Sequence, residues 1–313
     1  MVVGTWNLEN LFRPAAEGGP ADDEAYEAKL DSLAGVITGL APDVLAVQEV
    51  GQPEALDDLK ERLDGRWHTE TSAFPDARGI RVGFLSRLAL AEVRQARPFP
   101  ERLDPVQVDD DGPPAHEMGR GALRARVRAD GEDLDLVTCH LKSKLLSFPG
   151  QRFSARDEGE RARYAAYALY RRSAEAVTVR AEADKLLDGH GSERPVIVLG
   201  DLNDEPDAGT TQILLGPAGS EIATPGFDRP DRGDASRLWN LAPLIPQERR
   251  FSRIFRGRGE LLDHILVSHS LLSRVEHIDT AASDLPSVTE DPNARRHAPA
   301  SDHAPVIAHL ALT

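Results

Sequence analysis

The stretch PVIVLGDLND, residues 195–204, decides the fold. Apolar residues run from Val196 to Leu199, and polar side chains follow directly after Gly200. Such a run predicts a buried strand that ends in a loop. Asp201 and Asn203 stand at that strand end, where a short polar side chain either forms a local turn or faces a site. The rest of the chain has to decide between these two interpretations.

The same arrangement of polar residues beside an apolar run recurs along the chain. The segments GTWNLEN, VLAVQEV, LVTCHLKSK, LLDHILVS and ASDHAPV supply Asn7, Glu49, His140, Asp263, Asp302 and His303. Taken singly, each of these residues has a structural explanation as a turn residue, an exposed strand end or a core histidine. Together they would gather carboxylates, amides and imidazoles without balancing charge, which favours a divalent metal ion. Hard oxygen ligands point to Mg²⁺, Mn²⁺ or Ca²⁺ rather than Zn²⁺.

The elements alternate in a way that favours two mixed sheets. Apolar spacing predicts helices over residues 25–40, 53–63 and 157–188. Strands are expected over residues 2–7, 43–50, 80–87, 88–96, 121–129, 134–142, 195–204, 250–256, 261–268 and 304–312. The turn signal DGED, residues 130–133, predicts a hairpin, which a purely parallel sheet does not explain. We therefore expect an α/β fold with two mixed sheets packed face to face and helices outside.

Composition limits the remaining possibilities. No apolar run among the 313 residues approaches the ~20 residues of a membrane span. The N-terminal segment has no basic region followed by an apolar core and is not expected to be a signal peptide; a cytoplasmic protein is expected, with a secreted precursor trimmed before expression as the alternative. The single cysteine, Cys139, fits a reducing cytoplasm, and we expect it to be a small core residue. No linker divides the chain, which indicates one domain over residues 1–313. Residues 98–119 are rich in Pro, Asp and Gly and are expected to form a surface loop.

The charge is acidic overall but basic in two places. The formal net charge is -15, which disfavours non-specific binding to polyanions. Residues 142–180 hold nine Lys or Arg and four acids, and residues 229–258 hold eight Arg and three acids. These two basic segments are either solvated surface or the binding surface for a phosphate-bearing ligand.

The motifs TWNLEN, QEV, CHLKSK, GDLND, LDHILVS and SDHAPV, in that order, resemble the endonuclease/exonuclease/phosphatase superfamily, whose fold is DNase I-like. GDLND followed at a long interval by SDHAP is the specific part of the match, which spans nearly the whole chain. The resemblance implies a four-layer α/β/β/α sandwich of two mixed β-sheets, with the site in a cleft at one edge of both sheets.

The resemblance also implies a role for each residue. Glu49 is similar to the principal metal-binding glutamate of the family, with Asn7 and Asp302 near the same ion. Asp201 is similar to the aspartate that orients or deprotonates the attacking water, and Asn203 would steer the phosphate. His303 would contact the phosphate and Asp263 would orient His303; an Asp263–His303 pair acting as the base remains an alternative. The resemblance further implies that His140 is a second histidine near the scissile group and that Lys142 and Lys144 contact substrate phosphates.

The expected activity is metal-dependent hydrolysis of phosphodiesters, with Mg²⁺ or Mn²⁺ and possible use of Ca²⁺. HLKSK resembles the bacterial nucleases of the family, so DNA, or RNA, is the expected partner. The alternative is a phosphatase or phosphodiesterase of a small or lipid phosphoester, similar to the inositol-phosphatase and sphingomyelinase branches. A non-catalytic binding module is disfavoured, because every matched position holds the expected residue type.

Overall fold

The structure is a computed structural model, and it describes residues 1–14, 16, 18–150, 152–225, 227, 229–282, 285–289 and 294–312. In these ranges, two six-stranded sheets and one three-stranded sheet are present. The first sheet has the order β13 (Val275–Thr280), β15 (Val306–Leu310), β1 (Val2–Leu11), β2 (Val44–Val50), β4 (Arg81–Ser86), β3 (His68–Thr71). The second has the order β5 (Ala91–Pro98), β6 (Glu117–Ala129), β7 (Glu132–His140), β8 (Val196–Asp201), β12 (Asp263–Ser268), β9 (Leu238–Asn240). The small sheet contains β11 (Arg258–Glu260), β10 (Arg253–Phe255) and β14 (Ser287–Val288).

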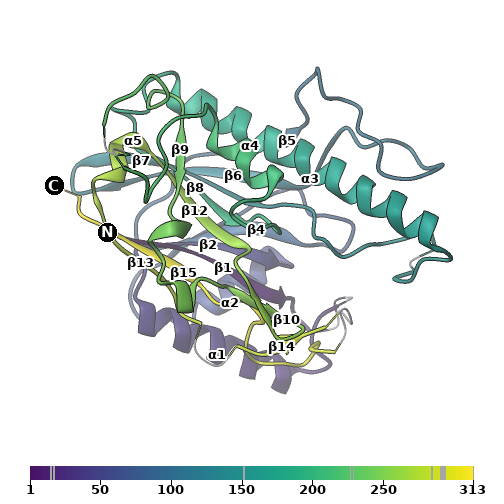
Figure 1. The fold of residues 1–313 in the computed structure, drawn as a ribbon. Coiled ribbons are helices and arrows are strands. Elements are labelled where there is room, and N and C mark those ends of the chain that lie inside the picture. Colours follow the sequence, from purple (N-terminus) through teal and green to yellow (C-terminus); the bar gives the residue numbers. More distant parts are fainter. Residues whose placement is uncertain are drawn as a thin grey trace.

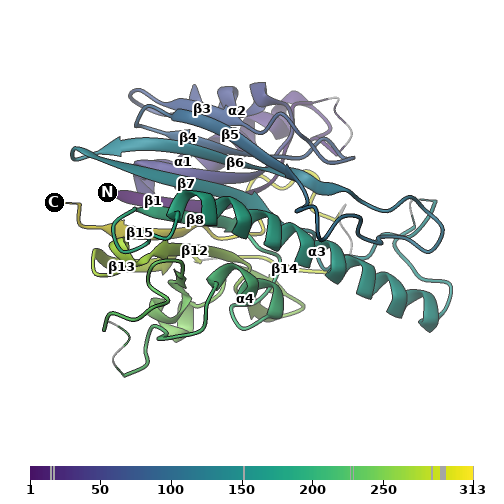
Figure 2. The ribbon, with the colours of Figure 1, turned by 90° about the horizontal axis from the view of Figure 1, so that it is seen from above.

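Helices cover the outer faces of the two large sheets. The helices are α1 (Asp23–Leu40), α2 (Pro53–Lys60), α3 (Glu158–Leu187), α4 (Gly209–Leu215) and α5 (His269–Leu272), with short 3₁₀ turns at Ala242–Leu244 and Gln247–Arg249. In Figure 1, α1 and α2 lie below the first sheet, and α3 and α4 lie above the second. Figure 2 shows α3 running across the second sheet and continuing past its edge. The expectation of a four-layer α/β/β/α sandwich is confirmed.

Three apolar clusters hold these layers together. Val3, Phe84 and Leu136 belong to the cluster between the two sheets, which draws residues from both. A second cluster packs α1 on the first sheet, and a third packs α3 on the second sheet. Cys139 belongs to the cluster under α3, where burial raises the pKa of its thiol. It is therefore a core residue, as the sequence indicated.

One feature of the topology brings the motif residues to one edge. Most neighbouring strands are antiparallel, but β1 pairs with β2 in parallel, and so does β7 with β8. These are the two parallel pairs among the described strands of the large sheets, and their carboxyl ends meet at the same edge of the sandwich. Strands β15 and β12 run antiparallel to β1 and β8, so they begin at that edge. Residues from six strands therefore converge there.

Some elements differ from the sequence-based expectations. The strand expected over residues 250–256 is only Arg253–Phe255, and it belongs to the small sheet. The loop expected over residues 98–119 is not purely solvated, because α3 holds its acidic run. The hydroxyl of Tyr164 donates to Asp109, and that of Tyr167 donates to Asp110. Of the described helices, none combines the length and the apolar character that crossing a membrane requires.

Candidate active site

Three of the motif residues form one row across the second sheet. Asp201 is the register partner of His140 on β7 and of Asp263 on β12. Register partners in neighbouring strands direct their side chains to the same face of a sheet. All three are buried, with exposed fractions of 4% for His140, 1% for Asp201 and 0% for Asp263. The sheet itself therefore sets the spacing of these groups.

Gly200 makes the close approach of β7 and β8 possible. Its φ is +153°, and a Cβ atom at this position would lie 2.0 Å from the carbonyl oxygen of Cys139. A side chain here would push the two strands apart just before His140 and Asp201. The glycine of the GDLND motif is thus a geometric requirement of the site.

Among the described residues, the carboxyl group of Asp201 has one hydrogen-bond partner on the first sheet and two contacts on its own side. The Nδ2 of Asn7, on the first sheet, donates to Oδ2 of Asp201 at 3.0 Å. The backbone N–H of Asn203 donates to Oδ1 at 2.8 Å, and Nε2 of His140 lies 3.3 Å from Oδ2. Burial and the charge of Asp263 raise the pKa of Asp201 to about 7. This carboxyl group can therefore take up and release a proton near neutral pH.

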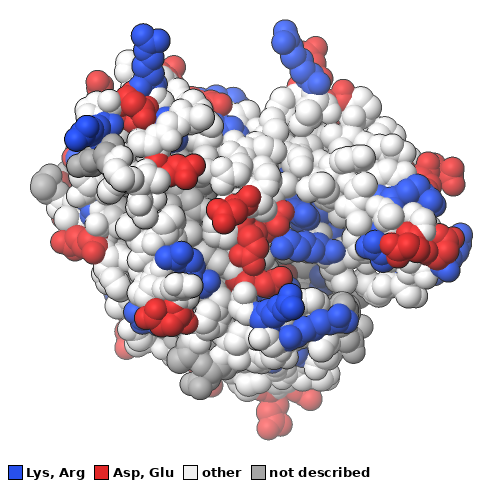
Figure 3. Space-filling view, in the orientation of Figure 1, with Lys and Arg blue, Asp and Glu red and all other residues white. Residues whose placement is uncertain are grey.

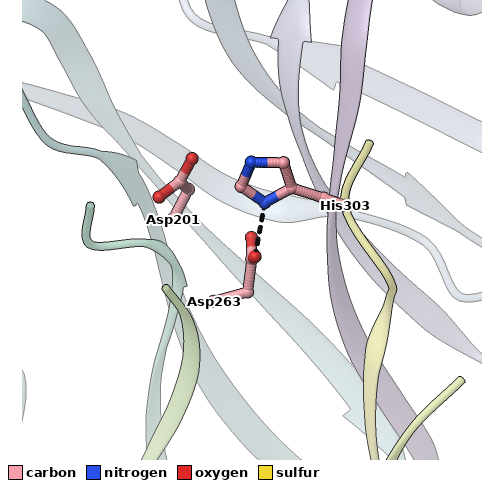
Figure 4. A group of neighbouring side chains, drawn as sticks. All are labelled: Asp201, Asp263 and His303. Carbon is pink, nitrogen blue, oxygen red and sulfur yellow. Dashed lines mark hydrogen bonds and ion pairs between the residues drawn. The ribbon is translucent and has the colours of Figure 1, made fainter. Parts of the chain in front are cut away.

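His303 and Asp263 form the second strong pair. Nδ1 of His303 lies 2.6 Å from Oδ2 of Asp263, and the other ring nitrogen is on the side of Asp201 (Figure 4). Burial opposes the charged imidazolium, but the charges of Asp263, Asp302 and Asp201 outweigh it and raise the pKa of His303 to about 10. His303 is therefore cationic at neutral pH, when it is a hydrogen-bond donor and not a base.

The backbone around His303 is fixed by contacts with β1. The indole N–H of Trp6 donates to the carbonyl oxygen of His303 at 2.7 Å. The hydroxyl of Ser301 donates to the carbonyl oxygen of Asn7 at 2.7 Å and accepts from the N–H of His303 at 3.0 Å. This answers why the segment just before β15 carries polar residues: they lock His303 against the end of β1.

Two buried polar atoms of the site have no hydrogen-bond partner among the described residues. They are Nδ1 of His140 and Oδ1 of Asp263. Buried polar atoms without partners are rare in folded proteins, and each calls for an explanation such as a bound ion, a water or a catalytic role. Burial lowers the pKa of His140, and so do the charges of Arg120, His303 and Arg78, so its imidazole is neutral. Both atoms therefore hold unused hydrogen-bonding capacity in a buried position.

A second group of carboxylates lies around Lys29. Burial lowers the pKa of Lys29, and the charges of Glu9, Glu49 and Asp302 oppose this effect. Burial and the charge of Asp302 raise the pKa of Glu9 to about 7. The backbone N–H of Asp302 donates to Oε2 of Glu9 at 2.8 Å. These side chains therefore form one cluster.

A bulge shared by β1 and β2 builds this cluster. The register of the two strands shifts between Asn7 and Leu11. Glu9, Asn10 and Glu49 have φ angles of 49°, 56° and 60°, a left-handed conformation that non-glycine residues adopt mainly under local constraint. The N–H of Asn10 donates to Oε2 of Glu49 at 3.0 Å, which joins the two halves of the bulge. A bulge of this kind re-aims side chains that regular strand alternation would direct elsewhere.

The donor atoms fit a hard divalent cation. Asp201 and Asp263 bring carboxylate oxygens to this edge, and Oδ1 of Asp263 has no partner among the described residues; His303 lies within 4.8 Å of both, but as an imidazolium it has no lone pair to offer a metal ion. The raised pKa of Glu9 likewise reflects carboxylates held close to one another, which a cation would relieve.

Asn7 connects the two groups, because its Oδ1 accepts from the N–H of Glu9 at 2.9 Å while its Nδ2 reaches Asp201. Glu49 and Asp302 share a cluster with Glu9, whereas the amide of Asn7 lies between that cluster and Asp201. Asn7, Glu49 and Asp302 as metal ligands stay a prediction.

The two predicted substrate-binding lysines are both engaged within the protein. Nζ of Lys142 donates to the carbonyl oxygen of Leu145 at 2.8 Å and to that of Ser143 at 3.1 Å. Nζ of Lys144, whose side chain is 44% exposed, lies 3.2 Å from Oδ1 of Asp204. These contacts make Lys142 part of the loop that follows His140. Binding of substrate by either lysine stays a prediction.

Three residues of the site were not anticipated from the sequence: Glu9, Lys29 and Arg295. Glu9 stands two residues after Asn7, a spacing that places both side chains on one face of a regular strand. The bulge at Glu9 breaks this alternation, so the spacing in TWNLEN does not by itself place Glu9 in the site. Arg295 makes a two-point ion pair with Glu9, with Nε and Nη2 at 2.9 and 3.0 Å from the two carboxylate oxygens. No motif marks Lys29 or Arg295, because each is far in sequence from its partners.

Comparisons with known proteins agree with this geometry. The model of the endonuclease/exonuclease/phosphatase family matches residues 4–303. The catalytic domain of human Nocturnin with bound sulfate is 16% identical, with a TM-score of 0.60, covering 100% of this chain and 94% of that one.

Two further solved structures align over 100% of both chains. A mannosyl-6-phosphatase from Bacteroides thetaiotaomicron VPI-5482 is 15% identical with a TM-score of 0.58. A 3′-5′ exonuclease from Neisseria meningitidis is 18% identical with a TM-score of 0.54. A comparison with curated protein sequences gives no match. At these identities the likeness shows the DNase I-like fold alone, and the match of the family model shows that the chain belongs to the endonuclease/exonuclease/phosphatase family.

Proposed function

We propose that this protein is a divalent-metal-dependent phosphodiesterase that cleaves nucleic acid, DNA in the first place. The observation that carries the proposal is the buried row of His140, Asp201 and Asp263, with Asn7 and His303 brought against it from the other sheet. In this arrangement Asp201, whose pKa is about 7, lies beside the cationic imidazolium of His303. Attack on a phosphodiester needs both a base for water and positive charge for the phosphate oxygens.

Each residue of the row has a distinct part in the proposed reaction. Asp201 orients the attacking water and accepts its proton, since its pKa is about 7. The imidazolium of His303 donates from Nε2 to a phosphate oxygen, and Asp263 holds the ring through Nδ1. Neutral His140 faces the Asp201 carboxylate with Nε2 at 3.3 Å, and a proton on this nitrogen holds the base in position. These assignments favour Asp201 over the Asp263–His303 pair as the base, because a histidine with a pKa of about 10 is protonated at neutral pH.

The metal ion would be held by carboxylate and amide oxygens at the ends of β1 and β2. We assign Glu49, Asp302 and Asn7 to this task, as the family resemblance implied, and add Glu9 because it shares their cluster. Bound Mg²⁺ or Mn²⁺ supplies the charge that offsets the phosphate oxygens and the leaving oxygen. Asn203 steers the phosphate from the loop after β8; its Nδ2 already donates to the carbonyl oxygen of Leu141 at 3.0 Å.

The positive field on one side of the site supports nucleic acid as the substrate. The charges of Arg120, Arg78 and Lys142 all act on His140. Figure 3 shows basic side chains beside acidic ones around a hollow near the middle of the molecule's face, over the ends of the sheets. A polymer with a phosphate at every residue gains from such a field beyond the scissile bond.

A small phosphoester remains the second candidate substrate. The net charge of -15 disfavours binding of a polyanion. Lys142 and Lys144 are also engaged by groups of the protein itself. A small substrate would need only the buried row and the metal ion.

A panel of substrates distinguishes the two candidates. Purified protein with Mg²⁺ or Mn²⁺ is incubated with plasmid, linear duplex DNA, single-stranded DNA, RNA and small or lipid phosphoesters, and a His303→Ala variant controls for contaminating nucleases. We expect cleavage of DNA whose rate falls steeply with salt, because each phosphate contact adds ~0.9 to the logarithmic salt slope. Intact nucleic acids together with release of phosphate or a head group from a small ester would contradict the nuclease function and favour the second candidate.

A further inference from the structure

A separate cavity opens at the start of β6, next to the loop that follows His140. Its volume is about 360 Å³, and its lining includes Arg97, His116, Gly119 and Arg171. None of these residues belongs to the site described above. Gly119 and Lys142 nevertheless lie together, because their backbone N–H groups donate to the two carboxylate oxygens of Glu175, at 3.0 and 2.6 Å. The cavity therefore borders the segment that carries His140.

Glu175 also fixes the position of Arg171 in this cavity. Nε of Arg171 donates to Oε1 of Glu175 at 3.1 Å, and the Glu175 side chain is 3% exposed. One buried carboxylate thus joins α3, the start of β6 and the loop after β7. Among the described residues, only Nε of Arg171 makes a hydrogen bond, so the N–H groups of its two Nη atoms keep their donor capacity. Arg171 is 29% exposed, so a ligand can reach it.

Gly119 is what admits the guanidinium. A Cβ atom at this position would lie 2.0 Å from Nη2 of Arg171 and 3.1 Å from Cζ. Any other residue would displace the Arg171 head group from the wall of the cavity. The absence of a side chain at Gly119 therefore leaves room for the guanidinium of Arg171. A change to alanine would move the guanidinium but keep its charge.

Each arginine around the cavity pairs with an acid, so the cavity is close to neutral overall, and spare N–H donors rather than net charge would bind an anion; Nε of Arg97 has no hydrogen-bond partner among the described residues. Arg97 pairs with Glu117 at 2.8 Å, and Asp76 is neutralised by Arg120 at 2.9 Å. Glu175 contacts both Nε of Arg171 and the backbone N–H of Lys142. In the adjoining loop, burial lowers the pKa of Lys142, and so do the charges of Arg171 and Arg120, whereas the charge of Glu175 opposes them; the resulting pKa is about 8. An added negative charge would relieve this repulsion.

We propose that this cavity binds the phosphate group adjacent to the scissile one, with Arg171 and Arg97 as its hydrogen-bond donors. The inference rests on the proposed nuclease function and names a substrate contact beyond the buried row. A planar guanidinium held at one edge presents its remaining N–H groups in a geometry that suits phosphate oxygens. A diester with a single phosphate has no group for this cavity.

The test compares an oligonucleotide with bis(p-nitrophenyl) phosphate, which carries one phosphate, using the full chain with Mg²⁺. Arg171→Gln and Gly119→Ala should each raise KM for the oligonucleotide about tenfold, the scale of one lost charge-assisted hydrogen bond, and change kcat less than about twofold. Their KM for the small diester should move less than about twofold. Arg161→Gln is the matched control, because Arg161 lies on the same helix, is exposed, and pairs with Glu158. It should match the wild type on both substrates.

The outcomes separate this inference from the proposed function. If the wild type cleaves the oligonucleotide and both variants behave like the control, the cavity binds no substrate phosphate and only this inference fails. An equal loss on both substrates would assign Arg171 to the fold or to the buried row instead, which also overturns it. If the wild type hydrolyses the small diester and leaves every oligonucleotide intact, the proposed function and this inference fail together.

Discussion

Replacing Asp201 by asparagine should make the metal-free protein more stable while it removes the activity. The carboxyl group is 1% exposed, and burial together with the charge of Asp263 raises its pKa from 3.8 to about 7. The folded state therefore resists ionisation of a group that ionises readily in the unfolded chain. Asparagine keeps the shape of the side chain and removes this conflict.

The size of the effect follows from the two pKa values. Each pKa unit corresponds to ~1.4 kcal/mol, so the ionised carboxylate costs the folded state ~4 kcal/mol above pH 7. The carboxylate accepts from Asn7 and from the N–H of Asn203, and an amide oxygen can replace only one of its two oxygens. Losing one such hydrogen bond costs ~1 kcal/mol. We therefore expect a net gain of ~3 kcal/mol in the free energy of unfolding.

The sign of the pH dependence gives an internal control. Because the folded-state pKa is raised, the penalty is absent below the unfolded pKa of 3.8 and grows as the pH rises toward about 7. Urea denaturation in EDTA, at about pH 8 and at about pH 4, measures it. The variant should be more stable only at the higher pH, and its hydrolysis rate with Mg²⁺ should fall by ~10²-fold or more. A stability difference that does not change with pH, or a variant with near wild-type turnover, would refute the role of Asp201.

Three further predictions concern the charges of the site. His303→Ala should lower kcat by ~10²-fold or more, the scale of losing one transition-state donor. Asp263→Asn should lower the pKa of His303, so that activity is lost at a less alkaline pH than in the wild type. An unchanged kcat of His303→Ala in steady-state kinetics would disprove the role of His303. The kcat/KM of the wild type should rise through about pH 7 as Asp201 loses its proton and fall near pH 10 as His303 does, and a flat profile over this range is incompatible with both assignments. Glu9→Gln should weaken Mg²⁺ binding in a calorimetric titration, whereas the exposed Glu61→Gln should not; equal affinities would exclude Glu9 from the metal site.

The convergence of the motifs could be predicted because it depends on strand ends. The apolar run before Asp201 predicts a buried strand, and the polar residues after it mark the edge of a sheet. Parallel pairing of β7 with β8 and of β1 with β2 then brings the ends together. Periodicity alone does not tell which strand ends lie next to each other. The resemblance of GDLND and SDHAP to one superfamily indicated that these two motifs lie in the same site.

The positions of Glu9 and Lys29 could not be predicted with the same means. A bulge with left-handed φ at Glu9, Asn10 and Glu49 breaks the alternation of side chains, and no glycine marks it. Lys29 is 6% exposed on α1, although a lysine in an amphipathic helix is normally taken as a surface residue. Its place is set by carboxylates on three other segments, and sequence separation hides that contact.

The basic segments show another limit of sequence reasoning. Arginines close to the motifs were candidates for phosphate binding, yet several are engaged elsewhere. Arg152 pairs with Glu160 at 2.7 Å, Arg249 pairs with Asp279, and Arg250 donates to the carbonyl oxygen of Ile245. Proximity in sequence to a motif does not fix the direction of a long side chain. Conversely, Arg120 acts on His140 although it lies outside both segments.

The central claim is that this edge of the sandwich hydrolyses phosphodiesters with a divalent metal ion. The most direct measurement is the initial rate of hydrolysis of labelled DNA and of bis(p-nitrophenyl) phosphate by the wild-type protein, in Mg²⁺, after addition of excess EDTA, and after Mg²⁺ is restored in excess of EDTA. The account predicts cleavage in Mg²⁺, loss in EDTA and recovery with Mg²⁺, since the single imidazolium of His303 does not offset the charge of both the phosphate oxygens and the leaving oxygen. An unchanged rate in EDTA would contradict the metal dependence, and no hydrolysis of either substrate in Mg²⁺ or Mn²⁺ would contradict the assignment of the site.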